Sequence, residues 1–227
     1  MRKILGIAGA MILLSLSLMP AIANMNTEEQ ERGTVRCYII GPGKLVKREA
    51  RITVEEASII VDKLQKAVYA YQPYRNRENM ELTDEEKEEI EKLFDDALAE
   101  LKKANILPAD IDAKAIGLLP DFGIGFLNPI LSLGIGYSYI PLYPGEAFIG
   151  FMLRPIFVQY FFLGYTGCIN FRLVPPRMEY WDWMGTQTFM ILGFVGIYLD
   201  FADIGFGFPP IQCLMGEALL TAGVDWI

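Results

Sequence analysis

The chain has 227 residues, of which 52% are hydrophobic, and it carries a formal net charge of −8, three cysteines and no histidine. The lack of histidine excludes the His-activated nucleophiles of serine and cysteine hydrolases, as well as imidazole metal ligands. Three cysteines without C-x-x-C spacing argue against a structural zinc module, and the negative charge argues against a nucleic-acid partner.

The first 23 residues have the pattern of an export signal. Arg2 and Lys3 precede an uncharged, mostly apolar run over residues 4–23, which ends in Ala-Ile-Ala, a site of the kind that signal peptidase cuts. The run is also long enough to span a bilayer as an uncleaved anchor, and this alternative stays open. In either case the chain after Asn24 is predicted to be exported, to an extracytoplasmic location at the cell surface or a membrane.

Residues 24–112 are predicted to hold a short β element followed by an amphipathic helical hairpin. Residues 34–40 are rich in β-branched and aromatic side chains and run into a Gly-Pro-Gly turn. Thr53 and Thr83 each begin a T-x-x-E capping box, which satisfies the free amide groups at a helix start. Apolar residues recur at intervals of three and four after each box, so two antiparallel helices packed stripe to stripe are expected.

The second predicted helix and the segment after it carry a resemblance. Residues 82–90, Leu-Thr-Asp-Glu-Glu-Lys-Glu-Glu-Ile, continue to residues 101–111, Leu-Lys-Lys-Ala-Asn-Ile-Leu-Pro-Ala-Asp-Ile. With an export signal before them and a Gly- and aromatic-rich segment after them, they resemble uncharacterised exported proteins of archaea. The resemblance covers the helical third of the chain and transfers no functional residue. It implies an archaeal cell envelope as the setting.

The composition changes near residue 112. Residues 25–112 contain 14 Lys or Arg and 20 Asp or Glu, whereas residues 113–227 contain 4 and 8, and aromatic residues rise from 5 to 23. In the stretches 122–126, 134–139 and 204–208, large side chains alternate with glycine or serine, which is the period of a β-strand. The sequence therefore predicts an α+β protein, with an N-terminal helical hairpin followed by a Gly/aromatic-rich β domain that forms a small barrel or sandwich.

Three uncharged runs leave a membrane interpretation open. They cover residues 122–145, 155–171 and 184–199, which are spanning or near-spanning lengths. Prolines and glycines in the first run would interrupt a helix, and helices do not account for the alternation of period two. An extracytoplasmic β-rich domain is therefore favoured over a multipass bundle. A third alternative is a β domain whose apolar surface rests on lipid or on a partner subunit.

An aromatic and acidic cluster at residues 179–183 is a candidate ligand site. It follows two prolines and is expected on a loop, where aromatic rings could stack on a sugar and two carboxylates could hydrolyse a glycosidic bond. The favoured alternative is that the rings cap the core or lie at a membrane interface with their polar tips in water. The candidate ligand-binding residues are Tyr180, Trp181 and Trp183, and the candidate catalytic carboxylates are Glu179 and Asp182.

Three aspartates could supply oxygen ligands to a cation. Asp121 and Asp203 each begin the same six-residue pattern, Asp-apolar-Gly-apolar-Gly-Phe, and Asp200 lies close to Asp203 in the chain. They lack the D-x-D-x-D-G spacing of a calcium loop, so aspartates that form turns at strand ends are the favoured interpretation. The sequence has no nucleotide-binding or nucleophile-elbow motif, and no cofactor is expected.

Cys168 and Cys213 are the candidates for one disulfide, because both lie in the aromatic segment of a chain that is predicted to be exported. Cys37 would then remain unpaired. Free and buried cysteines are the alternative, since free cysteine is among the most buried residue types.

The sequence thus favours an exported structural or binding protein over an enzyme. The expected partner is a membrane surface or another envelope component, with oligomerisation through an apolar surface as a further expectation and no role for nucleic acid. Two alternative functions stay open. One is a carboxylate-based hydrolase of extracellular glycans, and the other is a multipass integral membrane protein.

Overall fold

The computed structural model of the chain describes residues 32–41, 44–75, 77, 82–112, 127–141, 148–173 and 176–226. The predicted export signal at residues 1–23 lies outside these ranges. So do Asp121 and the alternating stretch at residues 122–126.

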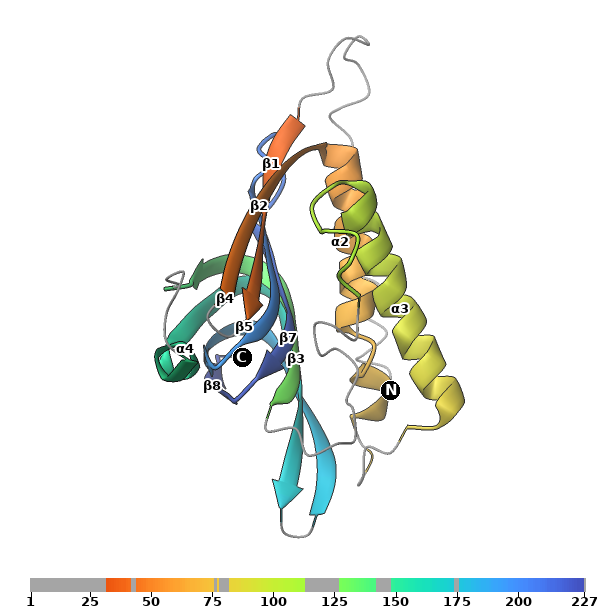
Figure 1. Cartoon of the computed structure of the whole chain (residues 1–227), viewed down its shortest axis with the longest axis vertical. Coiled ribbons are helices and arrows are strands. Elements are labelled where there is room, and N and C mark those ends of the chain that lie inside the picture. Colours follow the sequence, from red (N-terminus) through yellow and green to blue (C-terminus); the bar gives the residue numbers. More distant parts are fainter. Residues whose placement is uncertain are drawn as a thin grey trace. The chain divides into compact units, whose positions relative to one another are not determined.

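Eight strands of the described residues form one sheet (Figure 1). These strands are β1 (Arg32–Gly41), β2 (Lys44–Thr53), β3 (Asn128–Tyr139), β4 (Pro155–Leu173), β5 (Pro176–Leu192), β6 (Val195–Asp203), β7 (Ile211–Ala218) and β8 (Leu220–Asp225). Their order across the sheet is β2-β1-β6-β7-β3-β4-β5-β8, and every neighbouring pair is antiparallel. The sheet is therefore open, with β2 and β8 at its edges.

Two long helices lie on one face of this sheet (Figure 1). The helical elements are α2 (Val54–Val68), the short 3-10 helix η1 (Gln72–Tyr74), α3 (Asp84–Lys103) and α4 (Phe148–Leu153). Both predicted capping boxes are confirmed. The Thr53 hydroxyl accepts a hydrogen bond from the Glu56 N–H, and the Glu56 carboxylate accepts one from the Thr53 N–H; Thr83 and Glu86 repeat this arrangement at α3.

The predicted fold class is wrong. Strand β1 precedes the two long helices in the chain, yet it pairs with β6, where Arg36 lies opposite Asp200, a residue 164 positions further on. Strands from both compositional segments thus belong to one open sheet, and α2 and α3 follow β2 and precede β3. The protein is not an N-terminal hairpin followed by a separate barrel or sandwich. No local sequence pattern specifies so distant a strand partner, so this pairing could not be predicted from the sequence.

The sheet carries a hydrophobic cluster on each face. On the face toward α2 and α3, which we call the helix face, Leu64 of α2 and Phe94 of α3 are buried in one cluster with Leu199 of β6. On the opposite face, Tyr160 and Phe189 belong to a second buried cluster. Because side chains alternate along a strand, the central strands contribute to both clusters.

The predicted alternation of large and small residues at 134–139 is confirmed as part of β3. Gly134 makes room there for the ring of Tyr160 on the neighbouring strand β4. A Cβ atom at Gly134 would lie 2.5 Å from Cγ of that ring. Glycine at this position therefore allows the aromatic side chain to pack flat against the β3 backbone.

The alternating stretch at residues 204–208 is not a strand. Strand β6 ends at Asp203, and a turn follows in which Gly205 and Phe206 have φ angles of 72° and 52°. The strand prediction is wrong here because glycine at alternate positions also suits a turn that needs positive φ.

The uncharged runs form strands where the structure describes them. Residues 155–171 lie within β4, and residues 184–199 extend over β5 and β6. Within the described ranges, no helix is long and apolar enough to cross a membrane.

Candidate functional site

The aromatic and acidic cluster at residues 179–183 lies on strand β5 and not on a loop. Its pairing with β4 has no register shift over this stretch, so its side chains alternate between the two faces of the sheet. Glu179 shares a face with Trp181, whereas Asp182 shares the helix face with Tyr180. The two carboxylates predicted for glycan hydrolysis therefore diverge and do not converge on one substrate.

The two tryptophans of this cluster pack inside the protein. Trp181 and Trp183 have ring centroids 4.6 Å apart, and both pack against the cluster on the opposite face. Trp183 also lies 6.2 Å from the ring of Phe189. The two rings are therefore partly buried and extend the core, and they do not form the exposed platform that stacking on a sugar would need.

Asp182 forms a buried ion pair on the helix face. Its side chain is 1% exposed, and Nε of Arg75, which follows η1, lies 3.0 Å from Oδ1. The hydroxyls of Tyr165 and Tyr180 hydrogen-bond to each other on the same face. Burial raises the pKa of Asp182, and the Arg75 charge and the Tyr165 hydroxyl oppose this increase. The pair joins the segment after α2 to β5 and has the geometry of a structural contact.

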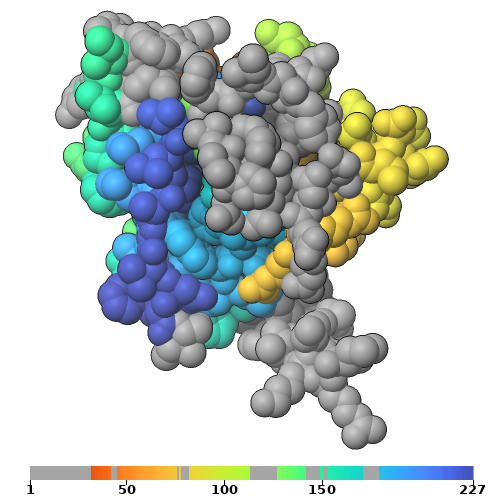
Figure 2. Space-filling view, turned by 90° about the horizontal axis from the view of Figure 1, so that it is seen from below, coloured from red at the N-terminus to blue at the C-terminus, as the bar shows by residue number. Residues whose placement is uncertain are grey.

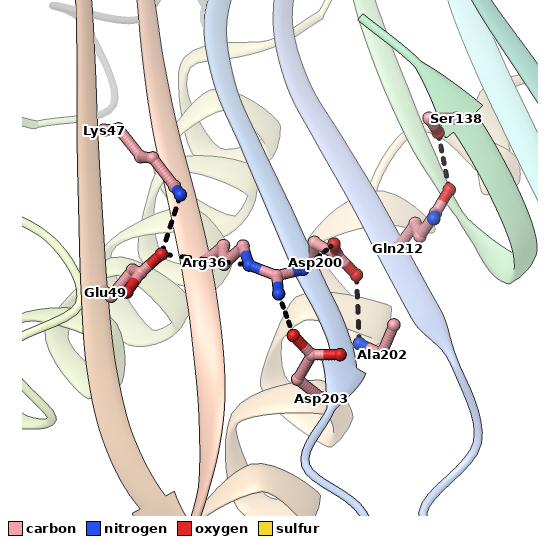
Figure 3. Close-up of polar contacts among 8 residues, drawn as sticks. All are labelled: Arg36, Lys47, Glu49, Ser138, Asp200, Ala202, Asp203 and Gln212. Carbon is pink, nitrogen blue, oxygen red and sulfur yellow. Dashed lines mark hydrogen bonds and ion pairs between the residues drawn. The ribbon is translucent and has the colours of Figure 1, made fainter.

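Asp200 and Asp203 are held by an arginine (Figure 3). Nη1 of Arg36 lies 3.3 Å from Oδ2 of Asp200, and Nη2 contacts Asp203. Nε of Arg36 lies 3.9 Å from Glu49, which also pairs with Lys47 at 2.7 Å. Arg36 thus neutralises two of the three aspartates predicted as cation ligands. Among the described residues, no three acidic or cysteine side chains are grouped as a metal site would require.

All three cysteines are free and buried. Cys168 lies on β4 and Cys213 on β7, with β3 between these strands, and the two side chains belong to clusters on opposite faces. Strands two positions apart in a sheet are separated by about 10 Å, which is too far for a disulfide. The structure therefore lacks the predicted disulfide. Burial raises the pKa of the Cys37 and Cys168 thiols to about 12, which keeps them protonated and unreactive.

The helices cover only part of the helix face. Along β3, Leu131 and Leu133 are buried in the cluster that α2 and α3 complete, but Tyr137, which projects to the same side, is 67% exposed. The neighbouring parts of β4 and β5, and the edge strand β8, extend this uncovered region, which we call the bare face. Its large exposed side chains are Tyr137, Tyr139, Phe157, Phe161, Phe162, Leu163, Leu220, Val224 and Trp226.

The strand register shows that the bare face is one continuous surface. Gln159 of β4 lies opposite Tyr137 of β3 and Thr188 of β5, and Thr188 lies opposite Val224 of β8. Residues directly opposite each other in an antiparallel sheet project to the same face. The rings of Tyr137 and Phe161 meet edge to face, with centroids 5.7 Å apart. The next row holds Tyr139, Phe157, Met190 and Ala222, so neither row carries a charge.

A bulge in β4 exposes three consecutive apolar residues of the bare face. The pairing of β4 with β5 is interrupted between Tyr160 and Gly164, and the intervening Phe161, Phe162 and Leu163 are 48%, 55% and 37% exposed. Leu163 has a φ of 51°, a left-handed conformation that is uncommon outside glycine. The Thr186 hydroxyl donates a hydrogen bond of 3.1 Å to the carbonyl that begins the bulge. Strained and exposed apolar residues of this kind are a feature of functional sites.

The sequence predicts an apolar surface that rests on lipid or a partner, but the candidate residues that it indicates, at 179–183, lie outside the bare face. The available signal was the run Tyr-Phe-Phe-Leu at residues 160–163, where three large apolar residues in succession break the alternation of a half-buried strand. The C-terminal residues that complete the bare face, dark blue in Figure 2, are visible at the molecular surface.

Comparison of the chain with protein-family models, with curated proteins and with solved structures finds no match.

Proposed function

We propose that this protein is a non-catalytic binding protein that associates with a membrane surface through the bare face. The observation that supports the proposal is a continuous, uncharged sheet surface on which nine large apolar side chains are exposed. Soluble proteins rarely leave a large contiguous apolar patch in water, since its burial is favourable by about 25 cal/mol per Å². Such a surface is expected to bind an apolar partner.

The chemistry of the bare face favours lipid over a protein partner. Specific protein interfaces combine apolar anchors with arginine and several hydrogen bonds across the contact. The two central rows of the bare face instead offer only Gln159 and Thr188 between their apolar and tyrosine side chains. Tyrosine and tryptophan, represented here by Tyr137, Tyr139 and Trp226, suit the boundary between headgroups and hydrocarbon because each has an apolar ring and a polar tip.

The bulge supplies the part that enters the lipid. Phe161, Phe162 and Leu163 are consecutive, apolar and exposed, so we expect their side chains to insert while the flanking tyrosines stay at headgroup level. The predicted export signal would bring this surface to the outer side of a membrane. The protein would then serve as a structural or binding component of the cell envelope.

The carboxylates expected for a glycan hydrolase, the alternative function, are not arranged for catalysis. Glycosidases need two carboxyl groups that face one substrate from about 5 to 9.5 Å apart, whereas Glu179 and Asp182 project from opposite faces of β5. The described residues therefore give no support to a glycan hydrolase at this site.

Replacing Phe162 by aspartate is expected to lower partitioning onto neutral phosphatidylcholine vesicles by at least about tenfold, because the change removes an exposed phenyl ring that would insert into lipid and adds a charge. The matched control is Ile59→Asp, which places a charge at an exposed apolar residue of α2 outside the bare face. Co-flotation with vesicles measures both variants against the unaltered chain. Equal loss in both variants, or no loss in either, would contradict docking through the bare face.

A further inference from the structure

We propose that the free edge of β8 pairs in antiparallel fashion with β8 of a second copy of this chain, so that two sheets join into one. The proposal rests on the edge strands of the sheet and stands independently of membrane association. An edge strand presents unpaired N–H and C=O groups, and proteins normally protect such an edge with charges, proline or a bulge.

The other edge of the sheet is protected. Strand β2 has the sequence Lys-Leu-Val-Lys-Arg-Glu-Ala-Arg-Ile-Thr, in which five of ten residues are charged. Lys47, Glu49 and Arg51 are exposed, and the first two form an ion pair of 2.7 Å. A second strand could add to β2 only by approaching this row of charges, which opposes edge-to-edge association.

The β8 edge lacks these protective features. Its sequence is Leu-Thr-Ala-Gly-Val-Asp, with one charge and no proline, and its register with β5 is continuous without a bulge. Five of its six residues are exposed, among them Leu220 and Val224 at 49% and 52%. A regular, exposed and nearly uncharged edge strand is a template for another strand.

The hydrogen bonds of β8 define which groups are available. The N–H of Trp226 donates to the carbonyl of Thr186 at 2.8 Å, so this residue directs its backbone toward β5. Backbone groups alternate along an antiparallel strand, and the N–H and C=O groups of Thr221, Gly223 and Asp225 therefore point to the free edge. They form a row of donors and acceptors that a second strand can pair with.

A second β8 is the occupant that this edge fits. Two identical strands that pair antiparallel about a two-fold axis put their Asp225 residues at opposite ends, so the single charge of each strand does not meet its copy. With the axis normal to the sheet, Leu220 and Val224 of both copies project to the same side. The two bare faces then become one surface of twice the extent.

Sedimentation velocity of the full chain tests the proposal, and a concentration-dependent monomer–dimer equilibrium is expected. Asp225→Pro removes an outward N–H from each copy and should raise the dimer dissociation constant by at least about tenfold. Tyr139→Lys, which changes the bare face away from the edge, should leave the constant unchanged while it weakens vesicle binding. A chain that is monomeric up to its solubility limit overturns the proposal.

Hydrogen exchange of the unaltered chain provides a second readout that does not depend on how a variant folds. The amides of Thr221, Gly223 and Asp225 should become protected as protein concentration rises. If dimers form while these three amides exchange freely, the interface lies elsewhere and the β8 proposal is wrong. Failure of membrane association would appear separately, as loss of vesicle binding in a chain that still dimerises.

Discussion

Replacing Gly136 by alanine is expected to lower the free energy of unfolding by about 3 kcal/mol or more. A Cβ atom at this position of β3 would lie 1.9 Å from the carbonyl oxygen of Gln159 and 2.8 Å from Cα of Tyr160. Both neighbours are main-chain atoms of β4, so relief of the contact requires a shift of that strand. The shift would disturb the hydrophobic cluster around Tyr160 on the opposite face.

Gly41→Ala is the matched control. Gly41 also lies in a strand, but a Cβ atom there would have no heavy atom within 4 Å, so its effect should stay within about 0.5 kcal/mol. Denaturant unfolding followed by tryptophan fluorescence measures both variants. Equal stability of Gly136→Ala and Gly41→Ala would contradict the close approach of β3 and β4.

Arg75→Met is expected to destabilise the protein by about 2 to 3 kcal/mol at neutral pH. The change leaves the carboxylate of Asp182, whose side chain is 1% exposed, without its cation, and an uncompensated buried charge is costly. The expected loss of stability is smaller than for a fully buried ion pair, because the Arg75 side chain is 55% exposed. The double variant Arg75→Met/Asp182→Asn should recover part of the loss, since it removes the charge as well. If the loss of unfolding free energy in the double variant equals the sum of the losses in the two single variants, the two residues do not interact.

The same pair predicts a pH dependence. Burial raises the pKa of Asp182 above its ordinary value of 3.8, so the folded state holds this proton more tightly than the unfolded state. Relative to Asp182→Asn, the unaltered protein should be most stable below pH 3.8 and should lose that advantage as pH rises through the raised pKa. Unfolding measured across this window for both proteins checks the sign. A relative gain in stability with rising pH would mean that the pKa is lowered in the folded state.

Features with a local cause could be predicted from the sequence. The capping boxes at Thr53 and Thr83 depend on residues three positions apart, and both helices begin where the boxes predict. The alternation at 134–139 depends on a period of two residues and correctly indicated a strand. Free, buried cysteines were also among the alternatives that composition left open.

Features that depend on distant pairing could not be predicted. The pairing of Arg36 with Asp200 places β1 between β2 and β6 in a sheet whose other strands come mostly from the second half of the chain. Without this pairing, the helices looked like a separate hairpin. The carboxylates Glu179 and Asp182 looked like a pair because an expected loop leaves side-chain directions open, whereas a regular strand sends them to opposite faces.

The bare face illustrates why exposure is harder to predict than secondary structure. Tyr137 and Leu133 project to the same side of β3, and both have large side chains. Helices α2 and α3 nevertheless cover only the region of Leu133. Whether a strand residue is buried depends on the length and position of the helices above it, which the strand's own sequence does not encode. The bulge at Phe161–Leu163 depends in the same way on its pairing with β5.

Quenching of Trp226 fluorescence by brominated lipids tests membrane docking through the bare face most directly. Trp226 is 58% exposed, and its Nε1 donates to Thr188 on the bare face, whereas Trp181 and Trp183 pack against the cluster on the opposite face. Vesicles with brominated acyl chains should quench part of the emission, and this part should be absent from Trp226→Phe. If the chain binds the vesicles while Trp226 is not quenched, another part of the chain makes the contact and the proposed docking is contradicted.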